Sequence, residues 1–479
     1  MVLISNIGSK IISFLTLGVL SRFLNTESFG NFSAIQNSAN SGNMIGSLGI
    51  PVVLQIKTAN IEEANKEEVN AIISNSIITY LLANGAVCLI LLLFPYIFTQ
   101  YLLNSNLDSS YNFHLVLLIL LMAVNQIPLY VLIGFGEFKE YALRNVAFNL
   151  ITLIITVIFL YIFGKTLTSA LAALYMSNLV TIGLTMMIFR NIVIKYNLHL
   201  KFIPDVRYIK MIISSGFIYY IGNTFLVAIS GLVTISVFYK YLSPDEYGYL
   251  RIATAISVIL SIIPSAIQPV NLSKIFLDGD QKRLKSVQIR IIPFITIFIF
   301  LLISSNLFLL ISILFGPNYT SGTEFIYYII LLQIPAIYLG IFSNFITASG
   351  ALNFIGFVAV IGTFTLMISL TILTPIFKID AYIYSSFITT FLSLLLVVLK
   401  ELKSNNYIHK LEAISFLINI LILSLNLIFI YYFPTFGILI ALLLITTYSL
   451  LSYNFCFTDD EKIKLKNNLW LKLSPLLKK

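Results

Sequence analysis

A nine-residue segment of the chain occurs twice. The run from Arg22 to Gly30 (RFLNTESFG) is matched 218 residues later by the run from Lys240 to Gly248 (KYLSPDEYG), and the alignment continues without a gap until Pro51 meets Pro269. Each copy has an apolar run, a basic residue, a short polar turn, an acidic residue, an aromatic-glycine pair and a second apolar run. In a chain this apolar, internal repetition predicts two related sets of membrane helices.

The composition supports a membrane protein. Of the 479 residues, 58% are hydrophobic and 10% are charged, against about 45–50% and about 25% in soluble domains. One span needs only about 20 apolar residues, so the longest uncharged stretches must be hairpins. We expect about fourteen helices, at residues 2–24, 30–56, 71–99, 113–135, 142–163, 167–190, 210–241, 247–274, 288–315, 325–348, 352–375, 381–400, 412–432 and 435–456.

The positive charges predict the orientation. With both termini in the cytoplasm, the cytoplasmic connections, the adjoining helix ends and the tail hold 23 of the 29 Lys and Arg residues, as the positive-inside rule requires. Topology therefore explains the net charge of +9, and no nucleic-acid partner is needed. Cys88 and Cys456 lie near opposite membrane faces, so we expect no disulfide between them.

The predicted fold is an all-α integral membrane protein with two pseudo-symmetric lobes of six helices. The N-lobe covers residues 1–190, a cytoplasmic loop residues 191–209 and the C-lobe residues 210–400. Two additional helices follow at 401–457, and a basic cytoplasmic tail at 458–479. Because six helices separate the copies, the copies cross the membrane in the same direction, about an axis along the membrane normal.

The turns inside the repeat have helix-start signals. Ser243-Pro244-Asp245-Glu246 offers an N-cap, a proline at the first position and two carboxylates in the first turn, and Asn25-Thr26-Glu27 is a simpler version. Arg22 and Lys240 then lie at the carbonyl ends of the preceding helices, where the helix dipole favours a cation. A ligand-binding role for these two residues is the alternative.

No enzymatic framework is visible in the sequence. His114, His199 and His409 lack the spacing of metal ligands, and no glycine-rich phosphate loop with a lysine is present. The outward loops are too short for a large catalytic domain. We therefore expect a protein that is not an enzyme, with no catalytic residue, no metal site and no cofactor.

Polar residues gather on particular helix faces. Gln36, Asn40 and Asn43 follow a spacing of four and three on the helix at 30–56, and Asn223 and Gln268 lie on helices of the second half. Small and hydroxyl residues often serve only to bring membrane helices together. Amides are more costly to leave facing lipid, so we expect these five to face a cavity.

Two cations lie inside predicted spans. Lys10 and Arg251 are each about 12 Å from the start of their helix, whereas all 20 acidic residues lie in loops or at span ends. Charge within the membrane indicates function by default, although long side chains can also reach the interface. A cationic, amide-rich cavity suits an anionic solute that carries sugars. The candidate substrate-binding residues are Lys10, Arg22, Gln36, Asn40, Asn43, Asn223, Lys240, Arg251 and Gln268.

The chain resembles a known family over essentially its whole length. The runs LSRFL at 20–24, ESFGNF at 27–32 and LFGPNY at 314–319, in this order and spacing, are similar to those of the O-antigen flippases (Wzx-type) of polysaccharide export, in the MATE-like superfamily. The resemblance implies a V-shaped pair of lobes that moves an undecaprenyl-diphosphate-linked oligosaccharide across the bacterial cytoplasmic (inner) membrane by alternating access. It implies membrane lipids as partners, together with a polysaccharide polymerase and a chain-length regulator.

Two alternatives stay open at this point. A drug/cation antiporter of the same superfamily would need buried carboxylates, and a membrane glycosyltransferase or polysaccharide polymerase would need catalytic acids on an outer loop. The sequence does not identify the sugars, the coupling ion or the oligomeric state.

Overall fold

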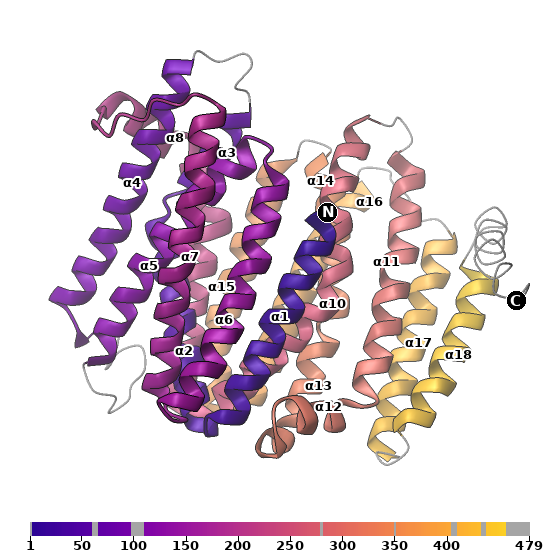
Figure 1. Cartoon of the computed structure of the whole chain (residues 1–479). Helices are drawn as coiled ribbons and strands as arrows, with labels where there is room; N and C mark the ends of the chain where they lie inside the picture. The colour runs from indigo at the N-terminus through magenta and orange to yellow at the C-terminus, as the bar shows by residue number, and fades with distance from the viewer. Residues whose placement is uncertain are drawn as a thin grey trace, which may run out of the picture. The chain divides into compact units, whose positions relative to one another are not determined.

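The computed structural model describes residues 2–59, 66–96, 110–277, 281–348, 351–403, 410–432 and 437–456. This part of the chain is built from helices, without a strand (Figure 1). They are α1 (Val2–Phe23), α2 (Thr26–Gly46), α3 (Ile50–Ala59), α4 (Lys66–Leu93), α5 (Ser110–Gly134), α6 (Phe138–Ile162), α7 (Leu167–Lys195), α8 (Val206–Tyr220), the π-helical turn η2 (Ile221–Phe225), α9 (Leu226–Tyr241), α10 (Pro244–Leu277), α11 (Gln281–Ser304), α12 (Leu307–Leu314), the 3₁₀ turn η3 (Pro317–Gly322), α13 (Thr323–Leu331), α14 (Gln333–Ala348), α15 (Leu352–Phe377), α16 (Asp380–Lys403), α17 (Lys410–Tyr432) and α18 (Gly437–Phe455).

The membrane class is confirmed. Within the described residues, 8 segments are long and apolar enough to cross a membrane, and shorter apolar helices accompany them. The all-α class predicted from the sequence is therefore correct, while the number of fourteen spans stays a prediction. The tail at 458–479 lies outside the described residues. Cys88 and Cys456 are both buried and free.

Several predicted spans are interrupted in the structure. The expected helix at 30–56 breaks between α2 and α3, where Leu48 and Gly49 have φ angles of 48° and 75°, a left-handed conformation that ends a helix. The expected helix at 210–241 begins earlier, at Val206, and contains the π-turn η2. Such turns occur frequently at functional sites.

The two copies of the repeat have the same helix boundaries. The first copy ends α1 at Phe23 and begins α2 at Thr26, and the second ends α9 at Tyr241 and begins α10 at Pro244, the same 218-residue offset. The Asn25 side chain accepts a hydrogen bond from the backbone N–H of Ser28 at 2.7 Å. Ser243 and Glu246 form the reciprocal capping box. Both predicted caps are confirmed.

The described chain divides into two compact units, which we treat separately. Unit 1 holds residues 1–259, 311–329 and 353–393, and unit 2 holds residues 260–310, 330–352 and 394–479. These ranges differ from the predicted lobes, and the division into lobes stays a prediction. In unit 2, α11 packs against α14, α17 and α18. There the Asn419 amide joins the hydroxyls of Tyr338 and Tyr448, at 2.5 and 2.7 Å.

Unit 1 contains a buried arginine that the sequence analysis did not single out. Arg144 of α6 is only 5% exposed. Its guanidinium donates to the side chain and carbonyl of Asn125 on α5 and to the Thr185 hydroxyl on α7, and it lies 5.0 Å from the Phe148 ring. Each partner is neutral, so hydrogen bonds and the ring, not an ion pair, hold this charge and join α5, α6 and α7.

A polar cluster lies at the connection between α5 and α6 and joins it to the end of α7. The Glu137 carboxylate pairs with Lys195 and accepts a hydrogen bond from the Tyr196 hydroxyl at 2.7 Å. The Tyr196 ring stacks on Phe135 at 4.5 Å. Burial opposes the ionisation of Glu137, but the hydrogen bonds from Lys195 and Tyr196 outweigh it and hold the pKa of Glu137 below its ordinary 4.5.

The two repeat turns contact each other through the glycine of the first copy. A Cβ atom at Gly30 would lie 1.9 Å from the Pro244 carbonyl oxygen, so only glycine allows α2 to approach the start of α10 this closely. The equivalent Gly248 is less crowded, since its Cβ atom would meet the Phe29 ring at 3.4 Å. The repeat is therefore symmetric in sequence but not in contact.

We predict that Gly30→Ala lowers the unfolding temperature and that Gly248→Ala leaves it unchanged or raises it. Both substitutions favour helix by up to about 1 kcal/mol, but at Gly30 the new methyl group meets backbone, where overpacking costs typically about 1–3 kcal/mol. A thiol-reactive dye can measure the unfolding temperature of the purified protein. Cys88 and Cys456 are buried in the folded state, so the dye reacts with them only when the protein unfolds. Identical shifts in the two variants would contradict the asymmetry.

The Glu137 cluster predicts a specific acid sensitivity. Because the folded pKa lies below 4.5, the ionised carboxylate stabilises the fold above that pH, and this stabilisation is lost as the pH falls through the folded pKa. Glu137→Gln should therefore melt at a lower temperature than wild type near neutral pH. At acidic pH the two melting temperatures should lie closer together. The control is Glu68→Gln, at an exposed carboxylate of α4. A constant difference between wild type and Glu137→Gln across the acidic range would disprove the assignment.

Candidate functional site

Three side-chain hydrogen bonds join α2 to α9 and α10, the helices that meet at the second copy of the repeat, and we call this set the polar seam. The Tyr239 hydroxyl on α9 donates to the Asn31 side chain at 2.8 Å. The Asn37 amide donates to the Tyr247 hydroxyl on α10, also at 2.8 Å. Arg251 of α10 donates from Nη2 to the Gln36 side-chain oxygen at 3.2 Å. The seam lies within unit 1.

Close packing holds the seam helices together along α2. The contact of Gly30 with Pro244 fixes one end. Toward the C-terminal end of α2, a Cβ atom at Gly231 of α9 would lie 3.1 Å from the Ser41 hydroxyl of α2. The Tyr220 hydroxyl of α8 donates to the Ile45 carbonyl at 2.6 Å. Small residues at helix contacts and hydroxyl bonds to backbone are common features of membrane helix packing.

The segment at 312–322 supports the seam from α12 and η3. Tyr319 is 1% exposed, and its ring meets Phe29 edge-on at 5.6 Å. Phe315 meets Phe14 of α1 in the same way at 5.3 Å. Gly316 has a φ angle of 109°, which accounts for the glycine in this motif. The LFGPNY run therefore packs against the first copy of the repeat.

Arg251 is the chemically distinctive residue of the seam. It is partly exposed, and its Nε–H is buried without a hydrogen-bond partner among the described residues. Its one hydrogen-bond acceptor, Gln36, is neutral, so no carboxylate neutralises the guanidinium through the described hydrogen bonds. An arginine with a free donor and an uncompensated charge can bind an anionic oxygen, especially one of a phosphate.

The other amides on α2 have different surroundings. Asn40 is exposed. Asn43 is 3% exposed; its amide donates to Gln126 of α5 at 2.8 Å, and its oxygen accepts from the Tyr80 hydroxyl of α4 at 2.9 Å. The structure thus places Asn43 in the core of unit 1, away from the hydrogen bonds of the seam.

Lys10, Arg22 and Lys240 do not take part in the three hydrogen bonds of the seam. Lys10 is partly buried within α1. Arg22 and Lys240 end α1 and α9, where the helix dipole favours them. Arg22 donates to the Ser312 carbonyl at 3.2 Å, and the Lys240 ammonium lies 5.2 Å from the Tyr241 ring. Asn223 and Gln268 have described backbone only, and their side chains lie outside the described part of the structure.

Sequence reasoning missed four members of the seam. They are Asn31, Asn37, Tyr239 and Tyr247. Asn31 directly follows Gly30 of the repeat, and Asn37 directly follows the candidate Gln36. Tyr247 belongs to the second copy of the repeat, and Tyr239 directly precedes it. The signal was present in Tyr247, which replaces Phe29 of the first copy and so adds a hydroxyl at an aromatic position. Its partner could not be identified from one helix, because the pairing depends on how closely the helices approach.

The acidic residues of the described chain lie at helix ends. Those that are buried are Glu137, which precedes α6, Glu401, in the last turn of α16, and Glu412, in the first turn of α17. In the described residues, no group of three or more His, Cys, Asp or Glu could hold a metal ion. The three hydrogen bonds of the seam join amides, tyrosines and one arginine, and no carboxylate takes part in them, although the carboxylates of Glu27 and Asp245 act electrostatically on Tyr239. The donors of Arg251 favour an anionic ligand at its end of the seam.

Comparisons with solved structures identify the fold. The structure is similar to the lipid II flippase MurJ in an inward closed conformation, with a TM-score of 0.76 and 14% identity over 94% of this chain and 98% of that chain. It is similar to an inward-facing MATE family multidrug resistance transporter of the MOP superfamily, with a TM-score of 0.62 and 13% identity over 82% and 94%. It is also similar to the MATE multidrug transporter DinF-BH, with a TM-score of 0.56 and 14% identity over 83% of this chain and 94% of that chain. No curated protein matches the chain.

A family comparison agrees with the motifs of the repeat. The family described as "Polysaccharide biosynthesis protein" matches residues 1–272, which is more than half of the 479 residues and includes both copies of the repeat. The chain is therefore a multi-pass membrane protein with the fold of MurJ and the MATE transporters, and it belongs to the polysaccharide biosynthesis protein family.

Proposed function

We propose that the protein is a flippase for a lipid-linked oligosaccharide. Its substrate would be an undecaprenyl-diphosphate-linked O-antigen or capsule repeat unit, carried from the inner to the outer leaflet of the bacterial cytoplasmic membrane. The family and the fold similar to a lipid II flippase support this proposal. The observation that carries it is Arg251, whose buried Nε–H lacks a partner and whose one hydrogen-bond acceptor is neutral.

In the proposed cycle the polar seam acts as a gate that opens and closes once per transport event. Hydrogen bonds between membrane helices contribute on average about 0.6 kcal/mol each, so the three bonds of the seam would add up to about 2 kcal/mol. Coupling free energies between a ligand and a conformational change are typically about 1–3 kcal/mol. A diphosphate that takes the Arg251 donor away from Gln36 would break one of these bonds, about 0.6 kcal/mol, and would shift the equilibrium further by as much as it binds the open state more tightly than the closed one.

Lys10 is the second proposed phosphate ligand, in the inward state, whereas Arg251 would act in the outward state. The remaining candidates, Arg22, Asn40, Asn43, Asn223, Lys240 and Gln268, stay predictions. A drug/cation antiporter is the rival function, because the fold is shared with MATE transporters. It is disfavoured by the position of the described carboxylates at helix ends, since a cationic substrate calls for acidic groups along its path.

Transport of a fluorescent undecaprenyl-diphosphate oligosaccharide in proteoliposomes tests the proposal. We expect protein-dependent movement between leaflets, measured by a membrane-impermeant quencher, without any change in glycan length. Arg251→Gln and Lys10→Gln should each slow this movement about tenfold to a hundredfold, as expected for the loss of a charge-assisted hydrogen bond. The protein reconstituted in each vesicle sample is quantified.

Lys165→Gln is the matched control, because Lys165 is an exposed cation 5.0 Å from the Phe23 ring and outside the candidate set. Its rate should equal that of wild type. Wild-type rates in both Arg251→Gln and Lys10→Gln would refute the phosphate role. Transport of cationic dyes but not of the lipid-linked glycan would favour the antiporter, and glycan lengthening by the purified protein would indicate an enzyme.

A further inference from the structure

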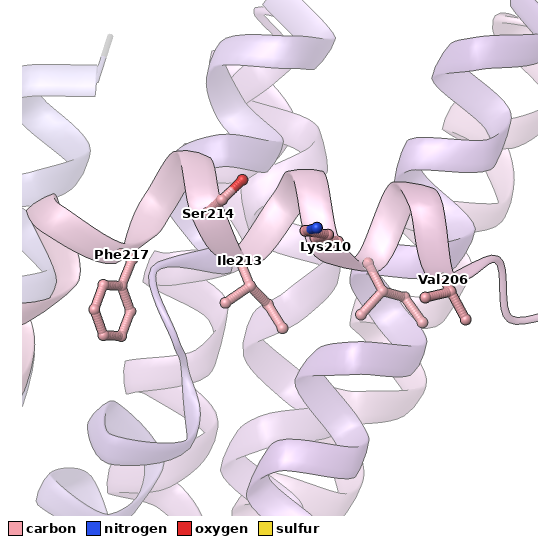
Figure 2. Close-up of a pocket in the computed structure, with 6 residues that line it drawn as sticks. Val206, Lys210, Ile213, Ser214 and Phe217 are labelled. Atoms are coloured by element: carbon pink, nitrogen blue, oxygen red, sulfur yellow. The ribbon is translucent and has the colours of Figure 1, made fainter.

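The helix α8 carries an apolar surface that the polar seam does not use. Residues Val206, Ile209, Lys210, Ile213, Ser214 and Phe217 lie along one face at helical spacing and line an open hollow of about 690 Å³. In Figure 2, Val206, Ile213 and Phe217 project from the same edge of the helix, and Ser214 projects from the opposite edge.

The opposite side of α8 anchors the helix in unit 1. Ile212 is fully buried in a cluster with Ile50 and Leu54 of α3 and with Val69 and Ile73 of α4. The lining face is therefore the outer face of a helix that is already packed. Val206 is 77% exposed and Phe217 is 47% exposed, so apolar area on this face remains open to a further apolar group.

The start of α8 is fixed before any ligand binds. The Asp205 carboxylate caps the helix by accepting the backbone N–H of Arg207 at 2.9 Å. The backbone N–H of Asp205 donates to the Asn75 side chain of α4 at 2.8 Å. The Asn70 side chain of α4 accepts from the His199 backbone at 3.1 Å. The hollow thus has a preorganised wall, which lowers the entropy lost on binding.

The charges around the hollow favour an anion. Asp205 is engaged by Arg207, whose Nη2 lies 2.9 Å from the carboxylate. Lys210 lies on the lining face, is exposed and forms no ion pair within the described residues. An open apolar helix face with an ammonium group beside it matches an amphiphile that joins a hydrocarbon chain to a phosphate.

We propose that this face of α8 binds the polyprenyl diphosphate end of the transported lipid. Lys210 binds the diphosphate, and Val206, Ile209, Ile213 and Phe217 contact the first isoprene units. The inference rests on the proposed function for the choice of lipid, and it adds a binding site separate from the polar seam. An ordinary bilayer phospholipid is the competing occupant, and the experiment distinguishes the two.

Photolabelling of the full-length protein in nanodiscs tests the site. The probe is a polyprenyl diphosphate with a diazirine on an isoprene unit near the phosphates and no sugar, and labelled peptides are identified by mass spectrometry. We expect label within residues 206–217, displaced by unlabelled polyprenyl diphosphate but not by polyprenol, inorganic diphosphate or phosphatidylglycerol. Lys210→Gln should reduce the apparent affinity about tenfold, the effect of one lost ion pair, and Ile213→Gln should also weaken labelling.

Arg207→Gln is the control, because it removes a cation from the same helix that is already paired with Asp205. It should label as wild type does, and melting temperatures check that all variants are folded. Unchanged labelling in Lys210→Gln, or equal displacement by phosphatidylglycerol, would overturn the inference. Labelling needs no transport, so the two proposals fail separately: normal flipping without label on α8 refutes only this site, and label without flipping refutes only the proposed function.

Discussion

The contact between Gly30 of α2 and the Pro244 carbonyl at the start of α10 is the constraint on which the polar seam depends. A Cβ atom at Gly30 would lie 1.9 Å from that oxygen, so any other residue would push the two helices apart. At this separation Gln36, Asn37 and Asn31 form hydrogen bonds with their partners on α9 and α10. The absence of a side chain at Gly30 thus allows the two copies of the turn to contact each other.

The sequence predicted what depends on local chemistry. The caps at Asn25 and Ser243 and the helix ends at Phe23 and Tyr241 follow from side-chain preferences within one turn, and all are present. The composition correctly predicted an all-helical membrane protein. Arg251 was identified because a charge inside a span is rare.

What depends on neighbouring helices was not predictable. Spacing placed Gln36 and Asn43 on one stripe of α2, but spacing does not say which helix lies opposite: Gln36 meets Arg251, whereas Asn43 meets Tyr80 and Gln126. Arg144 was missed because its helix begins at Phe138 and not at 142. This shift moves the arginine from the expected end of the span into its interior. The break at Leu48 and Gly49 did have a local signal, Gly49 followed by Pro51 in the first turn of α3, but the expected helix at 30–56 ran through it.

In the proposed mechanism the seam must separate during transport, and distance measurement between its two sides tests this most directly. Spin labels at the exposed positions Glu27 of α2 and Tyr241 of α9 would report the separation by pulsed electron paramagnetic resonance in nanodiscs. The account predicts one short distance without substrate and a second, longer population when an undecaprenyl-diphosphate oligosaccharide is added. A single distance that is the same with and without substrate would contradict it.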